Sequence, residues 1–142
     1  MSDLYKIAIR FLHRREYSSY ELREKLKQKE FDVSAIEQLL SQLQAQGYQS
    51  DERFVSMVLR HDYDKGYGFE HIKRKLAHQH QISHELIQRI AEDLALDWFS
   101  SIERVLTKKF PELNRHCANE YQKAYRFLQY RGFRIEEIRD VL

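Results

Sequence analysis

The sequence predicts an all-α protein whose three tandem three-helix repeats form an elongated, curved array. Three observations support this fold class. The 142-residue chain has only 4 Gly and 1 Pro, far fewer than a sheet protein with many turns needs. Apolar residues recur at helical spacing along almost the whole chain. A pattern of paired helices also recurs about every 50 residues.

Each of the three helices of the first repeat has its own sequence signal. Its first amphipathic run carries apolar residues at helical spacing: Leu4, Ile7, Ala8, Phe11 and Leu12. The second helix is expected at the capping box of Ser18 and Glu21. The third is expected at the same arrangement of Ser34 and Glu37. Gly47 is expected to end it, since glycine adopts a left-handed terminal conformation at little cost.

Three stretches share one pattern: ELREKLKQKEFDVSAIEQLLSQL, HIKRKLAHQHQISHELIQRIAEDL and KAYRFLQYRGFRIEEIRDVL. Each has one apolar residue at the joint between its helices: Phe31, Ile82 and Phe133. Each is also preceded by another amphipathic run, which predicts repeats at 1–48, 49–95 and 96–142. A unit of about 45 residues buries too little core to stand alone, so neighbours must share apolar faces. The alternative is that helical periodicity makes any two helix pairs look alike.

Gly66 and Gly68 raise the question of a phosphate-binding loop. A Walker loop needs two glycines four residues apart, a following Lys-Ser/Thr, and a preceding strand, and GYGFEHIK has none of these. We therefore expect Gly66 to end one helix and Gly68 to lie near the cap of the next. Tyr67, between them, is expected either at the surface or under the turn.

No catalytic, metal or cofactor site is predicted. His78, His80 and His84 lie close in sequence, but residues two apart on a helix face different ways, so solvated histidines at a frayed helix end are favoured over a metal site. Cys117 has no partner for thiolate activation and is expected to be partly buried.

Carboxylates are expected to pair along their own helices. Glu21 with Lys25, and Glu70 with Arg74, have the spacing of ordinary helix-stabilising ion pairs. No acid in an apolar setting stands out as a general acid or base, so we predict that the chain is not an enzyme.

Charge and composition limit the possible partners. The net charge is +2, so a nucleic-acid surface requires segregation of charge rather than an excess of it. No apolar run approaches the roughly 20 residues of a membrane span, and the N-terminal region lacks the order of a signal peptide. With its one cysteine, the protein is expected in the reducing cytoplasm.

Basic and aromatic residues lie together in two places. They are Lys65, Tyr67, Lys73 and Arg74 in the middle repeat, and Arg126, Tyr130 and Arg131 in the third. Tyrosine with arginine is typical of binding surfaces for protein or nucleic acid. A solvated helix face with scattered ion pairs explains the composition equally well.

Five blocks in order resemble the RecX regulatory proteins: LHRREYSSYELREKL, GYQSDERFV, KGYGFEHIKRKL, DWF and KAYRFLQYRGFRIEEI. Together they cover nearly the whole chain. The resemblance implies a bacterial cytoplasmic modulator of the RecA recombinase that lies in the groove of the RecA filament on single-stranded DNA. It implies suppression of strand exchange, ATP hydrolysis and co-protease activity. The seven basic and aromatic residues above are the candidate contacts with RecA or DNA.

Two departures from the family pattern have structural consequences. Gln49 and Ser50 replace an apolar residue and an acid, although Ser50 can still cap the following helix. His80-Gln81-Ile82 replaces the usual Lys-Gly-Ile, and loss of that glycine predicts a strained or rerouted turn.

The chain is expected to act as a monomer with no cofactor and with at most weak direct DNA binding. The alternatives are a helix-turn-helix-like DNA-binding protein or a helical scaffold for another protein.

Overall fold

Nine α-helices follow one another along residues 2–142, the part of the chain that the computed structural model describes. No β-strand occurs within these residues. The helices are α1 (Asp3–Arg14), α2 (Ser19–Gln28), α3 (Val33–Ala45), α4 (Asp51–Asp64), α5 (Phe69–Gln79), α6 (His84–Leu94), α7 (Trp98–Lys109), α8 (Ala118–Tyr130) and α9 (Ile135–Val141).

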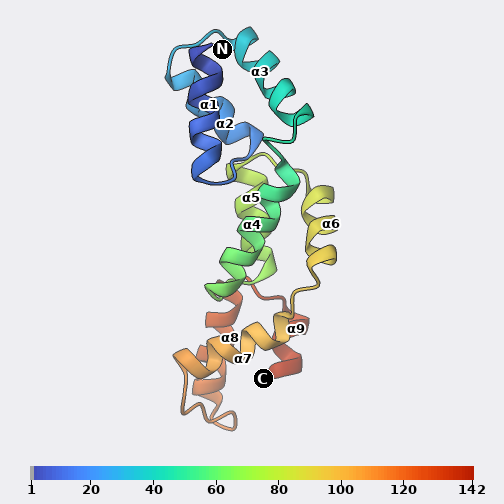
Figure 1. Cartoon of the computed structure of the whole chain (residues 1–142). Coiled ribbons are helices and arrows are strands. Elements are labelled where there is room, and N and C mark those ends of the chain that lie inside the picture. Colours follow the sequence, from blue (N-terminus) through green and yellow to red (C-terminus); the bar gives the residue numbers. More distant parts are fainter. Residues whose placement is uncertain (1) are drawn as a thin grey trace.

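The buried side chains form three hydrophobic clusters, one for each set of three consecutive helices. Leu22, Ile72 and Leu128 are fully buried members of the first, second and third cluster. Trp98 packs against both the second and the third. The three sets follow one another along one long axis, with the two termini toward opposite ends (Figure 1). The structure therefore confirms an elongated array of three-helix repeats, and we propose to divide it into units at 1–48, 49–95 and 96–142.

Side chains cap the first turn of several helices. Ser18 Oγ accepts a hydrogen bond from Glu21 N at 3.1 Å, as the predicted cap requires, whereas the Glu21 carboxylate pairs with Arg15. The predicted capping box of Ser34 with Glu37 is wrong. Asp32 has the extended backbone of a cap and accepts from Ala35 N at 3.3 Å, so the helix already includes Ser34.

The joint between the second and third helix of each unit contains one residue in the left-handed conformation. These residues are Glu30 (φ 64°), Gln81 (φ 55°) and Gly132 (φ 99°), equally spaced along the sequence. Only the third unit has the glycine that this conformation favours. The predicted strain at Gln81 is therefore present, and Glu30 shares it.

The glycines of the middle unit behave as predicted. The helix α4 ends at Asp64, and Gly66 follows with φ 88°. Gly68 is the residue before the first turn of α5. Both glycines therefore belong to a joint between two helices rather than to a phosphate-binding loop.

Candidate partner-binding surface

Neighbouring units meet through the same pair of elements at both junctions. The N-terminal end of the second helix of one unit contacts the joint after the second helix of the next. At the first junction, Ser18 before α2 contacts His80 after α5, with Oγ and Nδ1 3.0 Å apart. At the second junction, Gly68 before α5 donates to the Arg131 carbonyl after α8 at 2.8 Å. The repeat in the sequence is thus also a repeat in the way units stack.

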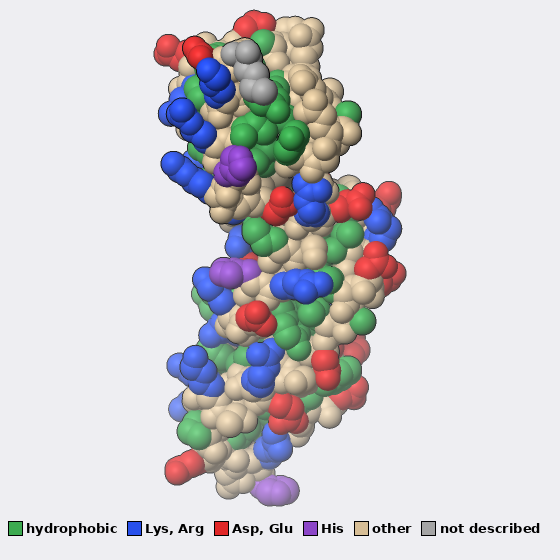
Figure 2. Space-filling view, in the orientation of Figure 1, with side chains coloured by type: hydrophobic (Ala, Val, Ile, Leu, Met, Phe, Trp, Pro, Cys, Tyr) green, Lys and Arg blue, Asp and Glu red, His purple; other side chains and the backbone are tan. Residues whose placement is uncertain are grey.

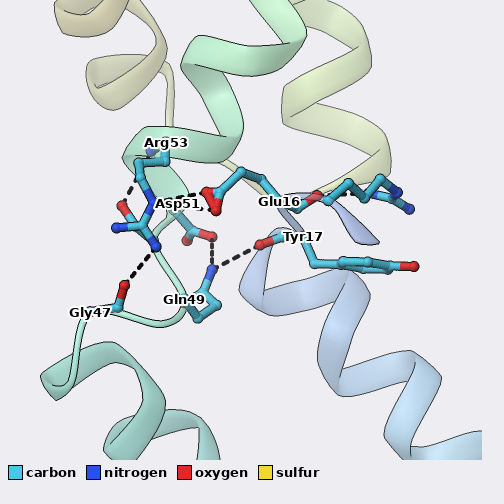
Figure 3. A network of polar contacts seen from close by, with 8 residues as sticks. Glu16, Tyr17, Gly47, Gln49, Asp51 and Arg53 are labelled. Atoms are coloured by element: carbon cyan, nitrogen blue, oxygen red, sulfur yellow. Dashed lines mark hydrogen bonds and ion pairs between the residues drawn. The ribbon is translucent and has the colours of Figure 1, made fainter. Parts of the chain in front are cut away.

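Polar groups dominate the first junction (Figure 3). Asp51 accepts hydrogen bonds from Ser19 N at 2.8 Å and from Ser19 Oγ at 3.2 Å. Gln49 is only 2% exposed, and its Nε2 donates to the Tyr17 carbonyl at 3.0 Å. Ser50 caps α4 as predicted, accepting from the Arg53 amide at 3.2 Å. Gln49, which departs from the family pattern, is therefore a buried connector between units.

The expectation of solvated histidines is wrong for His80. Its ring is half-buried, lies 4.6 Å from the ring of Phe54 and contacts Ser18. Burial lowers its pKa, because the charged imidazolium is poorly solvated there. His78 and His84 are exposed, as expected. Within residues 2–142, no group of three or more His, Cys, Asp or Glu is placed to hold a metal ion.

Two glycines bring backbones together at the second junction. A Cβ on Gly68 would lie 2.3 Å from the carbonyl carbon of Gly132, and one on Gly132 would lie 2.4 Å from His71 Cβ. The close approach lets Glu70 N donate to the Gly132 carbonyl at 3.1 Å. The second junction is therefore joined by direct main-chain hydrogen bonds.

Three of the seven predicted contact residues come together at this junction. The Arg131 guanidinium carbon lies 4.9 Å from the ring centre of Tyr67, and Arg131 Nη1 donates to the Lys65 carbonyl at 3.3 Å. Tyr67 is half-buried and stacks on His71, with ring centres 4.3 Å apart. Burial lowers the pKa of His71. Tyr67 and Arg131 therefore connect the second and third units.

The other four predicted residues lie along α5 and α8. Lys73 is half-buried and Arg74 is exposed on α5. Arg126 is exposed and donates to Gln122 on its own helix at 3.3 Å, while Tyr130 is 84% exposed at the end of α8. Tyr130 is thus the aromatic candidate most available to a partner.

The predicted pairing of carboxylates within helices is wrong for both examples. Glu21 pairs with Arg15 at 2.8 Å, and Glu70 pairs with Arg134 of the third unit at 2.9 Å. Both acids therefore connect separate elements rather than successive turns of one helix.

Sequence analysis also missed two buried acids. Asp62 is 3% exposed and accepts a hydrogen bond from Lys75 Nζ at 3.1 Å. Glu137 is buried at the start of α9, and burial raises the pKa of its carboxyl group. Asp62 could have been found, because it follows the apolar positions Val58 and Leu59 at helical spacing. Cys117 is half-buried before α8, in line with its prediction.

Charges are segregated on the molecular surface. Lys and Arg side chains follow one edge of the molecule in Figure 2, and Asp and Glu gather toward the opposite edge of the middle and lower parts. The basic residues of α7, Arg104, Lys108 and Lys109, are exposed, and sequence analysis did not single them out. Arg104 and Lys108 are four residues apart, which places them on the same face of the helix.

The fold defines this chain as a helical-repeat protein. Its three units form an elongated array, and basic side chains follow one edge of it. Family models match it at both ends: the first three-helix domain of RecX at residues 5–43 and the third at residues 97–142. The chain belongs to the RecX family. Among the described residues, no helix has both the length and the apolar character to cross a membrane.

Curated relatives and solved structures agree with this assignment. The chain is 35% identical to "Regulatory protein RecX" of Haemophilus influenzae (strain PittEE), over 100% of this chain and 95% of the relative. It is 39% identical to the Legionella pneumophila (strain Corby) protein of the same name, over 94% and 88%. The crystal structure of RecX from Lactobacillus salivarius superposes with a TM-score of 0.85 at 17% identity, covering 97% of this chain and 91% of that one. This last likeness shows the shared fold.

Proposed function

We propose that this protein is a negative modulator of RecA that binds the groove of the RecA filament on single-stranded DNA. In this proposal it suppresses strand exchange, ATP hydrolysis and co-protease activity without being an enzyme itself, and acts as a monomer in the cytoplasm. The observation that carries the proposal is the match, along nearly the whole chain, to proteins named as RecX regulatory proteins.

The shape and charge of the molecule support this role. An elongated array can contact more subunits of a helical filament than a compact domain with the same number of residues. Basic side chains along one edge complement an acidic protein surface or a DNA backbone. The proposed contacts are those predicted from sequence: Lys65, Tyr67, Lys73, Arg74, Arg126, Tyr130 and Arg131.

The first test is RecA's ATP hydrolysis on single-stranded DNA while the protein is titrated in. Inhibition well below one molecule per RecA, unrelieved by excess DNA, supports action on the filament. Inhibition that excess DNA abolishes would instead indicate a DNA-binding protein, whose binding would weaken steeply with salt. No inhibition, with no binding to RecA or DNA, would indicate a scaffold for another partner.

The placement of the contacts is tested by reversing two charges on α5. Lys73→Glu with Arg74→Glu is expected to weaken inhibition about tenfold or more, because two attractive charges become repulsive. Neither residue forms an ion pair within residues 2–142, so the helix should remain folded. The matched control is Lys6→Glu with Arg10→Glu, which reverses two exposed charges on α1. Wild-type inhibition by the α5 variant would contradict this placement.

A further inference from the structure

A cavity of about 470 Å³ lies where the second and third units meet. Its walls come from the end of α4, one face of α7 and the end of α8. Gly66 forms part of the wall, and a Cβ there would approach Val105 Cγ2 to 2.9 Å. The cavity belongs to the second junction and includes Lys65 and Arg131.

Beside the cavity, a small residue occupies a position that a large one occupies in the middle unit. Phe54 and Ser101 are each the fourth residue of the first helix of their unit. At the first junction the ring of Phe54 packs against His80, which follows α5 as Arg131 follows α8. In the third unit, the corresponding side chain is the much smaller Ser101, which is buried beside the cavity.

The hydroxyl of Ser101 also lacks a hydrogen-bond partner. The residue is fully buried and lines the cavity, yet its Oγ forms no hydrogen bond. Among the residues that the structure describes, no other buried side-chain nitrogen or oxygen is unpaired. An unpaired buried hydroxyl destabilises the fold, and because its neighbours cover this one, a bound polar group would contact it only after those side chains move.

Positive charge lines the cavity without compensation from ion pairs. The basic residues are Lys65, Arg104, Lys108, Lys109 and Arg131, and Asp64 is the one acid among the lining residues. None of the five forms an ion pair within residues 2–142. The ring of Phe127 provides an apolar wall, with Lys109 Nζ 5.4 Å and the Arg131 guanidinium carbon 5.2 Å from its centre.

We propose that this cavity binds the phosphate groups of a free nucleotide, such as a nucleoside triphosphate. Arginine and lysine together supply the hydrogen-bond donors and charge that phosphate oxygens require. The volume lies within the range of small-molecule sites, and Phe127 can contact a base or ribose. All lining residues belong to one junction, which suits a compact ligand better than an extended strand. The cavity shares Lys65 and Arg131 with the contacts proposed for RecA or DNA, so nucleotide binding is tested without either partner.

The test is calorimetric titration of ATP, and separately of inorganic tripolyphosphate, into the full chain without RecA or DNA. ATP is expected to bind at one site per chain, and tripolyphosphate to compete with it. Arg104→Ala with Lys108→Ala should weaken binding about tenfold or more, since two charge-assisted contacts are lost. The matched control, Lys6→Ala with Arg10→Ala, removes one lysine and one arginine from the exposed face of α1, outside the cavity, and should bind like the wild type.

A second variant tests the cavity itself. Ser101→Phe introduces the residue type found at the equivalent position of the middle unit, Phe54. It should abolish ATP binding, provided that circular dichroism shows that the variant keeps its helices. If the variant unfolds, the exposed Arg104 and Lys108 pair still decides the question. Absence of saturable ATP binding, or equal loss in the control pair, would overturn the proposal. So would a cavity-dependent binding of a single-stranded oligodeoxythymidine without binding of ATP or tripolyphosphate, because the ligand would then be a DNA strand.

Discussion

His80 connects the first two units through its ring and its hydrogen bond to Ser18. Charges of both signs face it, Glu21 and Asp51 against Lys75 and Arg15, so burial decides the direction of its pKa shift. A neutral imidazole suits this position, because it can pack on Phe54 and form one hydrogen bond with the Ser18 hydroxyl.

The stability of the protein is therefore expected to fall in mild acid. The pKa of His80 lies below its usual 6.5 in the folded chain, so the unfolded chain takes up a proton first as pH decreases. Protonation below about pH 6.5 then favours unfolding, and His71 acts in the same direction. Each histidine contributes less than about 1.4 kcal/mol per pH unit, the value for one whole proton.

Urea unfolding between about pH 7.5 and about pH 5.5 measures this effect. His80→Asn keeps a polar group near Nδ1 but cannot titrate, so the decrease in unfolding free energy should become shallower. His78→Asn is the control, because His78 lies two residues before His80, near the end of α5, and is exposed. An unchanged slope in His80→Asn would show that His80 does not carry the dependence.

At the scale of elements, the two junctions use one arrangement with different chemistry. Side chains join α2 to the joint after α5, whereas main-chain groups join α5 to the joint after α8. Glycine makes this difference, since Gly68 and Gly132 leave no side chain between the two backbones.

Two substitutions separate the conformational role of glycine from close packing. Gly47→Ala and Gly132→Ala both place alanine at positive φ, 79° and 99°, at a cost of about 1–2 kcal/mol. Only Gly132→Ala also forces a Cβ to within 2.5 Å of the His71 amide nitrogen, since nothing lies within 4 Å at Gly47. Overpacking should add about 1–3 kcal/mol to the loss for Gly132→Ala. Urea unfolding measures the loss of unfolding free energy in each variant. Equal losses in the two variants would show that the second junction accommodates the added methyl group without cost.

The sequence was sufficient to predict the helices and their repetition, because apolar periodicity and joint residues such as Ile82 and Phe133 depend on local pattern. It predicted the roles of Gly66 and Gly68 for the same reason. It could not predict contacts across junctions. The pairing of Glu70 with Arg134, the burial of His80 and the meeting of Lys65 with Arg131 depend on how units stack, which periodicity does not specify.

At the scale of the whole molecule, stability should resemble that of a repeat array. Each unit has its own hydrophobic cluster, so cooperativity between units depends on the junctions. The second junction shares Trp98 between two clusters, whereas the first depends strongly on buried polar groups. The first unit is therefore the part whose coupling to the rest is easiest to remove.

Gln49→Ala with Asp51→Ala is expected to uncouple the first unit. The pair leaves the buried Tyr17 carbonyl without its partner, at a cost of about 1–3 kcal/mol, and the partly buried Ser19 amide without its partner, at a smaller cost. Circular dichroism reports all helices, whereas fluorescence reports Trp98, the single tryptophan, at the second junction. In the variant, helix loss should begin at lower urea than the fluorescence change. Glu85→Ala with Gln88→Ala removes similar but exposed groups and should not separate the two curves. Coincident curves in the Gln49 and Asp51 variant would mean that apolar contacts alone couple the first two units, and that these buried polar groups align units without holding them together.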